Sequence, residues 1–209
     1  MKKFFIAGTD TGVGKTVVSA VLTLALQAYY WKPIQTGLAE DLSEGDTVKE
    51  LTGLPSCHFL PSVYALQAGL AIDQAARLEN ISVDLARCSL PDVSSSLIAE
   101  GAGGVFHPLN ATTTLFDLIK KLNLPVIIVC RGTLGTINHS LLTIDALRRR
   151  EVKIQGVVFS GELNSESALT IERWGNVRTL FHLPRFPCLE QAALVQWVAD
   201  NQAKILEGL

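Results

Sequence analysis

The sequence predicts an α/β protein of three layers, in which helices cover both faces of a mostly parallel sheet. Two patterns carry this prediction. Short apolar runs that suit buried strands alternate with longer segments that suit helices, and the connections between them are short. A strand, a helix and a strand joined in this way favour parallel pairing with right-handed crossovers, so both faces of the sheet are left for helices to cover.

The first half of the chain begins the alternation. Residues 4–7 form an apolar run that ends at a glycine, which suits a buried parallel strand. Residues 17–28 are apolar and contain no glycine or proline, so a helix is expected there, and residues 29–31 suggest a second strand. A short helix is predicted over 46–51, because glycine and proline follow it. Residues 96–99 are the next predicted strand.

The second half continues the pattern more clearly. Residues 55–95 are the least readable stretch and suggest only a helix near 70–78. Thr114 can cap a helix that runs to residue 122, and the run PVIIVC at 125–130 predicts a fully buried strand. The remaining predicted elements are helix 138–149, strand 154–159, helix 165–174, strand 177–183 and helix 189–206.

Composition indicates one globular domain over residues 1–209. Of the 209 residues, 48% are hydrophobic and 18% are charged, which is enough apolar material for a full core. The net charge of −2 gives no general attraction to nucleic acid. No stretch approaches 18 apolar residues, and the apolar run near the start is too short for a signal peptide. A cytoplasmic protein is therefore expected.

Three features have ordinary structural interpretations. The four cysteines are far apart, which argues against a zinc site or a disulfide framework, and Cys130 in its apolar run is expected to be a buried small hydrophobe. Arg148–Arg150 suit the cationic last turn of a helix. His139 is expected to be packed or capping, because no nucleophile with a matching base accompanies it.

The run GTDTGVGKT at Gly8–Thr16 predicts a phosphate-binding loop. Its glycines allow backbone N–H groups to surround a phosphate at the start of a helix. Lys15 can reach the β- and γ-phosphates of ATP, and the Thr16 hydroxyl suits Mg²⁺. Gly8 lies one residue further from Gly14 than in the common form of this loop. The loop residues expected to bind nucleotide are Gly12, Val13, Gly14, Lys15, Thr16 and Val17.

Polar residues after the other predicted strands should reach the same edge of the sheet. Lys32, in KPIQTG, could neutralise anionic oxygens, and Thr36 could hold a polar group of a substrate. Asp46 could bind Mg²⁺ or simply cap its helix. Glu100 ends a strand and precedes a glycine-rich run, which resembles the acid that completes Mg²⁺ binding in phosphate-loop enzymes.

Taken in order, the motifs GTDTGVGKT, KPIQTG, EGD, EGAGG and LGTINH resemble those of the dethiobiotin synthetase family. The resemblance covers the chain from the first strand to the last helix. It implies a fold of the P-loop NTPase type and an ATP- and Mg²⁺-dependent ligase of biotin biosynthesis. The implied substrates are 7,8-diaminononanoate and CO₂ or bicarbonate, which give a cyclic urea through a carbamate and a carbamic–phosphoric anhydride.

The resemblance also implies roles for individual residues. Lys15 and Lys32, with Thr11 nearby in the loop, would act on the carbamate and γ-phosphate. Thr16, Asp46 and Glu100 would hold Mg²⁺, and Asp46 with residues 100–103 would line the nucleotide site. A homodimer is implied, with the substrate at the interface. The implied substrate contacts are Thr36, Leu134, Gly135, Thr136 and Asn138, and the further nucleotide contacts are Gly101, Ala102 and Gly103.

Some segments depart from the family pattern. The link before Lys32 is several residues shorter than usual, and residues 66–72 lack the usual Ser-Pro-His. FSGE at 159–162 replaces the Asn-Asp that often reads adenine. This departure suggests either a looser choice of nucleotide or contact of the base with backbone at Leu183, Pro184 and Arg185.

Two other functions remain open at the sequence level. A cobyrinate-type amidoligase shares the variant loop, although the chain is short for an added glutaminase domain. A nucleotide-switched ATPase of the partitioning and septum-site type would carry a second lysine early in the loop, where this chain has Asp10 or Thr11.

Overall fold

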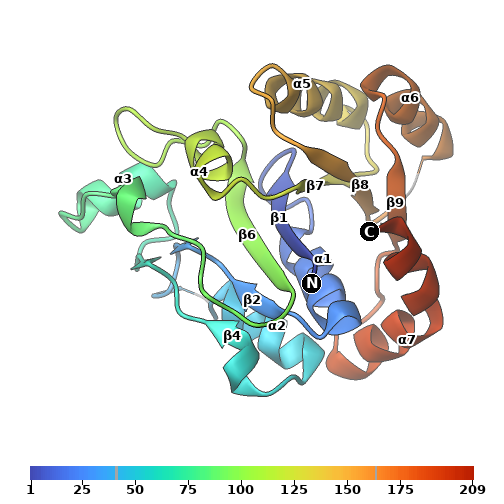
Figure 1. Cartoon of the computed structure of the whole chain (residues 1–209), viewed down its shortest axis with the longest axis horizontal. Helices are drawn as coiled ribbons and strands as arrows, with labels where there is room; N and C mark the ends of the chain where they lie inside the picture. Colours follow the sequence, from blue (N-terminus) through green and yellow to red (C-terminus); the bar gives the residue numbers. More distant parts are fainter. Residues whose placement is uncertain (41, 163) are drawn as a thin grey trace.

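A computed structural model describes residues 1–40, 42–162 and 164–209, and a parallel seven-stranded sheet lies at its centre (Figure 1). The strands are ordered β4-β2-β6-β1-β7-β8-β9, and every neighbouring pair in this sheet is parallel. A small separate sheet pairs β3 with β5. The strands are β1 Lys3–Gly8, β2 Tyr29–Trp31, β3 Ile34–Gln35, β4 Phe59–Leu60, β5 Tyr64–Ala65, β6 Leu97–Gly104, β7 Val126–Arg131, β8 Ile154–Ser160 and β9 Thr179–Leu183.

Helices cover both faces of this sheet, so the predicted three-layer α/β class is confirmed (Figure 1). One layer holds α1, α2 and α7, which contact one another, and the opposite layer holds α3, α4, α5 and α6. The helices are α1 Lys15–Leu26, α2 Glu44–Thr52, α3 Ile72–Leu78, α4 Leu115–Leu122, α5 Thr136–Arg148, α6 Ser165–Gly175 and α7 Gln191–Gly208. Short 3₁₀ turns lie at Ser56–His58 and Leu85–Arg87.

Alternating side chains of β1 divide the core into two clusters. Phe5 and Ala7 pack with buried side chains of α3–α6, whereas Phe4 and Ile6 pack with α1, α2 and α7. Because successive side chains of a strand point to opposite faces, a strand buried on both faces must be apolar throughout. This explains the continuous apolar runs in the sequence.

The predicted elements exist, but several boundaries differ from the predictions. β6 continues from the apolar run through the glycines to Gly104, and α5 begins at Thr136 instead of residue 138. β9 begins at Thr179, two residues later than expected. The poorly readable stretch 55–95 contains β4, β5 and α3. Among the described residues, none of the helices has both the length and the hydropathy to cross a bilayer.

The parallel arrangement positions the functional site. The loops that follow β1, β2, β6, β7, β8 and β9 all leave the same edge of the sheet, which is the edge where open α/β folds bind ligands. Residues that are far apart in the sequence are therefore neighbours there.

Candidate nucleotide and substrate site

A cavity of about 980 Å³ opens at the carboxyl edge of the sheet. Its walls come from the phosphate loop and the start of α1, the segment from Lys32 to α2, the end of β6 and the start of α3. The predicted residues that line it are Thr11, Gly12, Gly14, Lys15, Thr16, Val17, Lys32, Thr36, Glu100, Ala102 and Gly103. The structure thus brings most of the predicted site together.

The phosphate loop places Lys15 at the first position of α1. Gly14 caps the helix with a φ of 95°, a left-handed conformation that favours glycine. Lys15 is buried, and its Nζ donates to the carbonyl oxygen of Asp10 at 3.0 Å. Burial lowers the pKa of Lys15 to about 8. The negative charge of Glu100 raises this pKa, and the positive charge of Lys32 lowers it further. An anionic phosphate at this position would favour the ammonium form.

Glu100 is the centre of a buried polar cluster. Its carboxylate accepts from the Thr16 hydroxyl at 3.0 Å and from the Tyr30 hydroxyl at 3.1 Å. The ammonium of Lys32 lies 3.5 Å from the same carboxylate. Burial, followed by the negative charge of Glu100, raises the pKa of Tyr30 and keeps it a donor. Three donors therefore hold an acid that water does not reach.

Glu44 is a site residue that the sequence reasoning missed. Its carboxylate lies 2.7 Å from Lys32 Nζ and lines the same cavity. Burial opposes its ionisation, but the Lys32 ammonium and the hydrogen bonds at Glu44 hold its pKa below the ordinary value. The available signal was the motif EGD itself, whose first acid also lies in the first turn of α2.

The structure does not bring Asp46 to this cluster. Ser43 is the N-cap of α2, and its hydroxyl donates to the Asp46 carboxylate at 2.6 Å. Asp46 lines a different hollow with Lys49 and Gln191. It does not open the helix, as the sequence suggested, because α2 begins two residues earlier at Glu44. Its proposed metal contact requires the side chain to leave Ser43.

Thr16 and Glu100 have the chemistry that Mg²⁺ requires. A hydroxyl and a carboxylate oxygen 3.0 Å apart at the end of the phosphate cavity are hard oxygen ligands. Among the described residues, His, Cys, Asp and Glu side chains do not gather in groups of three or more that could hold a metal. A metal ion here would therefore depend on these two residues together with oxygens of the nucleotide.

A second hollow of about 280 Å³ adjoins the phosphate loop. It is lined by Thr9, Asp10 and Thr11 on one side, and by Phe106, His139 and Leu142 on the other. Phe106 and Leu142 are 56% and 61% exposed, so apolar surface borders this hollow. His139 is exposed, and the expectation that it would be packed or capping is wrong. It lies on the outer face of α5, where no cap is needed.

The loop at residues 134–138 lies outside the phosphate cavity of its own chain. Leu134 is fully exposed at 106%, and Gly135 caps α5 with a φ of 93°. Thr136 is buried, and Asn138 lies exposed in the first turn instead of at the N-cap. These residues therefore make no contact with the cavity within one chain, and their role in substrate binding stays a prediction.

Other predicted nucleotide contacts lie around the cavity without lining it. Val13 is buried in the α1 layer of the core, and Gly101 packs against Phe5 and Leu115. Leu183, Pro184 and Arg185 follow β9 at the same edge of the sheet, and the N–H of Gly161 donates to the Leu183 carbonyl at 2.9 Å. Ser160 lies so close to Gly14 that a Cβ atom added to Gly14 would strike the Ser160 hydroxyl.

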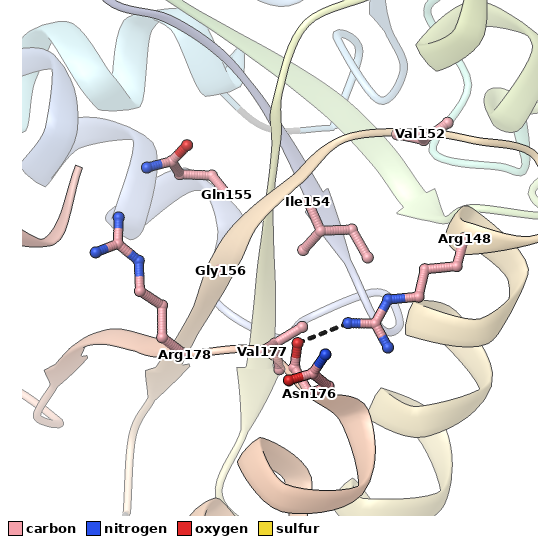
Figure 2. Close-up of a pocket in the computed structure, with 8 residues that line it drawn as sticks. All are labelled: Arg148, Val152, Ile154, Gln155, Gly156, Asn176, Val177 and Arg178. Carbon is pink, nitrogen blue, oxygen red and sulfur yellow. Dashed lines mark hydrogen bonds between the residues drawn. The ribbon is translucent and has the colours of Figure 1, made fainter.

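Cys130 and Arg148 lie outside the site. Cys130 is fully buried, and burial raises its pKa to about 12, so it is no nucleophile at neutral pH. Arg148 borders a separate hollow of about 270 Å³ near the amino ends of β8 and β9 (Figure 2). It donates there to the carbonyl of Asn176, the C-cap of α6, at 2.7 Å (Figure 2). The basic side chain thus ties α5 to α6.

Known proteins resemble this chain along nearly its whole length. A family model described as an AAA domain matches residues 2–193. A protein of Novosphingobium aromaticivorans named ATP-dependent dethiobiotin synthetase BioD is 50% identical over 201 residues, which cover 96% of this chain and 97% of the relative. A protein of the same name from Agrobacterium fabrum is 44% identical over 98% of this chain and 97% of its own length.

Solved structures show the same fold at low sequence identity. The MinC:MinD cell division protein complex of Aquifex aeolicus contains a chain that superposes with a TM-score of 0.58 over 99% of this chain and 96% of that one, at 12% identity. This likeness shows the P-loop NTPase fold and nothing about activity. The sequence relatives identify a family, which the shared fold alone does not. Because they are 50% and 44% identical over nearly the whole chain, the chain belongs to the dethiobiotin synthetase family.

Proposed function

We propose that this protein closes 7,8-diaminononanoate with CO₂ into the cyclic urea of dethiobiotin, using ATP. One observation carries the proposal. The buried ammonium groups of Lys15 and Lys32 line one cavity that begins at a phosphate loop, and Lys32 there pairs with the buried carboxylate of Glu100. The relatives that are named dethiobiotin synthetases extend over nearly the whole of this chain. A reaction that brings two anions together needs fixed cations at that point.

The steps balance without any other reactant. One amine of the diamine adds to CO₂ and loses a proton, which forms a carbamate. A carbamate oxygen then attacks the γ-phosphorus of ATP, and ADP leaves. The second amine attacks the carbonyl carbon of this mixed anhydride and loses a proton, the bond from that carbon to the phosphate oxygen breaks, and phosphate leaves as the ring closes. Lys15 and Lys32 stabilise the negative charge that develops on the transferred group.

Mg²⁺ forms part of this proposal. Thr16 and Glu100 would hold the ion, which would neutralise charge on the phosphates. Asp46 would join them only after its side chain turns away from Ser43. Glu100 also has a second function, because its carboxylate holds the hydroxyl of Tyr30 and the ammonium of Lys32 in place.

A homodimer completes the proposal. The segment at 134–138, which leads into α5, would then supply contacts to the substrate bound in the partner's site, as the family resemblance implies. The apolar border formed by Phe106 and Leu142 lies beside the hollow that adjoins the phosphate loop. A hollow of this kind suits the methylene chain of the diamine, with its reacting end at Thr11.

Product formation tests the assignment directly. The purified protein is incubated with Mg-ATP, bicarbonate and the diamine, and ADP, phosphate and the cyclic urea are measured together. We expect one ADP and one phosphate for each urea, and little ATP hydrolysis when the diamine is omitted. ATP hydrolysis that ignores the diamine would contradict the synthetase and favour a nucleotide-switched ATPase of the partitioning type. Amide formation from glutamine would favour the amidoligase alternative.

A further inference from the structure

His107 lies where the phosphate cavity meets the smaller hollow, and the proposed reaction gives it no role. It follows β6 by three residues and is half-buried. Among the described residues, His107 and Thr11 are the two that line both the phosphate cavity and the smaller hollow beside Phe106. A side chain at this position can reach a group that extends from one space into the other.

The hydrogen bonding of the ring determines its tautomer. The backbone N–H of Ile72, the first residue of α3, donates to His107 Nε2 at 3.2 Å. Nε2 must therefore be the unprotonated nitrogen, and the neutral ring carries its hydrogen on Nδ1. Burial lowers the pKa of His107, with Lys15 acting in the same direction and Asp73 opposing it. The neutral form with Nδ1–H is the form expected at pH 7.

Nδ1 faces the wall of the phosphate cavity. Gly103 lines that cavity, and a Cβ added to it would lie 2.7 Å from His107 Nδ1. Gly103 also has a φ of 62°, so the backbone approaches the ring in a conformation that favours glycine. Within residues 1–40, 42–162 and 164–209, Nδ1–H makes no hydrogen bond, although Nε2 makes one. The ring is thus held by one nitrogen and presents the other as a free donor.

We propose that His107 is a substrate-positioning residue, whose Nδ1–H donates a hydrogen bond to an oxygen of the carbamate. The assignment rests on the proposed function. Gly12, Gly14 and Lys15 line the phosphate cavity alone, whereas His107 and Thr11 line the apolar hollow as well. A neutral donor can orient one carbamate oxygen without adding a third cation to Lys15 and Lys32. The other oxygen stays available to attack the γ-phosphorus.

Two substitutions separate this role from a merely structural one. In His107→Gln the amide oxygen can replace Nε2 and accept from Ile72 N–H, but no donor remains at the Nδ1 position. In His107→Asn the amide nitrogen can replace the Nδ1 donor, but the bond to Ile72 is lost. Binding of the diamine is measured by calorimetry with bicarbonate and a non-hydrolysable ATP analogue, beside the KM for the diamine, nucleotide binding and the melting temperature.

We expect His107→Gln to weaken diamine binding and raise its KM on the order of tenfold, with nucleotide binding and melting temperature near those of the wild type. His107→Asn should keep diamine affinity within about threefold and melt at a lower temperature. The opposite order, with Gln normal in diamine binding and Asn impaired, would assign His107 to the support of α3 and overturn the proposal.

The tautomer gives a readout that does not depend on turnover. Nitrogen-15 NMR of labelled imidazole should show a protonated Nδ1 and an unprotonated Nε2 for His107, identified by its loss in His107→Gln. The reverse tautomer would overturn the proposal. The two proposals fail differently: a wild-type protein that neither binds nor converts the diamine contradicts the function, whereas normal turnover by wild type and His107→Gln alike contradicts only the role of His107.

Discussion

Lys32 and Glu100 are 68 positions apart in the sequence and 3.5 Å apart in the structure. Burying either charge alone would cost free energy, because a buried charge without a partner loses its hydration. Together with Glu44 and Thr16 they form a network in which each charge has a partner. Under the proposed function, a substrate oxygen would take the place of the Glu44 carboxylate at Lys32.

Replacing Lys32 with alanine tests its role at the reacting centre. We expect Lys32→Ala to bind ATP nearly normally and to lose about 3 kcal/mol of transition-state stabilisation, which slows turnover on the order of 100-fold. The measurements are kcat for urea formation and the Kd for ATP. Lys204 is exposed on α7, and Lys204→Ala serves as the matched control that should turn over normally. Normal turnover by Lys32→Ala would remove Lys32 from the mechanism.

Glu100→Gln tests the proposed metal contact. The amide keeps the size of the side chain but removes its charge, so the Mg²⁺ concentration for half-maximal activity and for half-maximal ADP binding should both rise by roughly tenfold. Tyr30→Phe is the matched comparison, because it removes one donor to the carboxylate and leaves the acid in place. A metal titration of Glu100→Gln that superposes on the wild type would show that Glu100 does not contact the ion.

His107 should make stability depend on pH in a defined direction. Its folded-state pKa is lowered, so as the pH falls below about 6.5 the unfolded chain binds a proton before the folded chain does. Lys15 and Asp73 act on it, and Asp10 and His139 line the adjoining hollow. Urea unfolding from pH 8 to pH 5 should show the wild type losing stability relative to His107→Gln below pH 6.5. Parallel pH profiles would contradict the lowered pKa.

At the scale of elements, the turn from β1 into α1 is the segment that local chemistry specifies most strongly. Three local features predict the same turn: the glycine at the N-cap of α1, the buried lysine that follows it, and the apolar helix. The start of α2 shows the limit of such reasoning. Ser43 and Asp46 satisfy each other as a local cap, so the acid that the motif suggested for the metal faces another hollow.

Two glycines of the phosphate loop should respond differently to alanine. Gly12 and Gly14 both have positive φ, which strains any other residue by roughly 1–2 kcal/mol. A Cβ at Gly12 would meet nothing within 4 Å, whereas a Cβ at Gly14 would strike the Ser160 hydroxyl. We therefore expect Gly14→Ala to lose more unfolding free energy and more ATP affinity than Gly12→Ala. Equal losses in urea unfolding and in ATP titration would mean that contact with Ser160 is unimportant.

At the scale of the whole molecule, exposed apolar residues lie beside the smaller hollow and just before α5. Phe106, Leu134 and Leu142 are 56%, 106% and 61% exposed, and they lie after β6, before α5 and on α5. An apolar patch rimmed by polar residues is typical of an interface. Residues that the family resemblance assigns to the substrate of a partner lie in the same region, which supports the proposed dimer.

Sedimentation velocity tests this dimer. We expect a dimer at micromolar concentration, and Leu134→Asp should shift it towards monomer and raise the KM for the diamine, because a charge buried in an interface is strongly disfavoured. Leu206→Asp changes a partly exposed leucine on α7 in the opposite helical layer and should leave both measurements unchanged. A wild-type monomer with full activity would rule out a site shared between subunits.

The sequence by itself determined the fold class, the phosphate loop and the family. These depend on local signals, such as apolar runs that must be buried on both faces, glycines at a strand-to-helix turn and motifs in a fixed order. The same signals named Lys15, Thr16, Lys32, Thr36 and Glu100, and all five line one cavity.

Only the tertiary structure decided which side chains of neighbouring loops meet. It placed Glu44 beside Lys32, turned Asp46 to Ser43, and brought His107 to Gly103 and to the first turn of α3. The physical reason is that loops leaving one edge of a parallel sheet come from distant parts of the chain. Their contacts depend on backbone direction and on competition for hydrogen bonds, and neither is encoded in the spacing of residues along one segment.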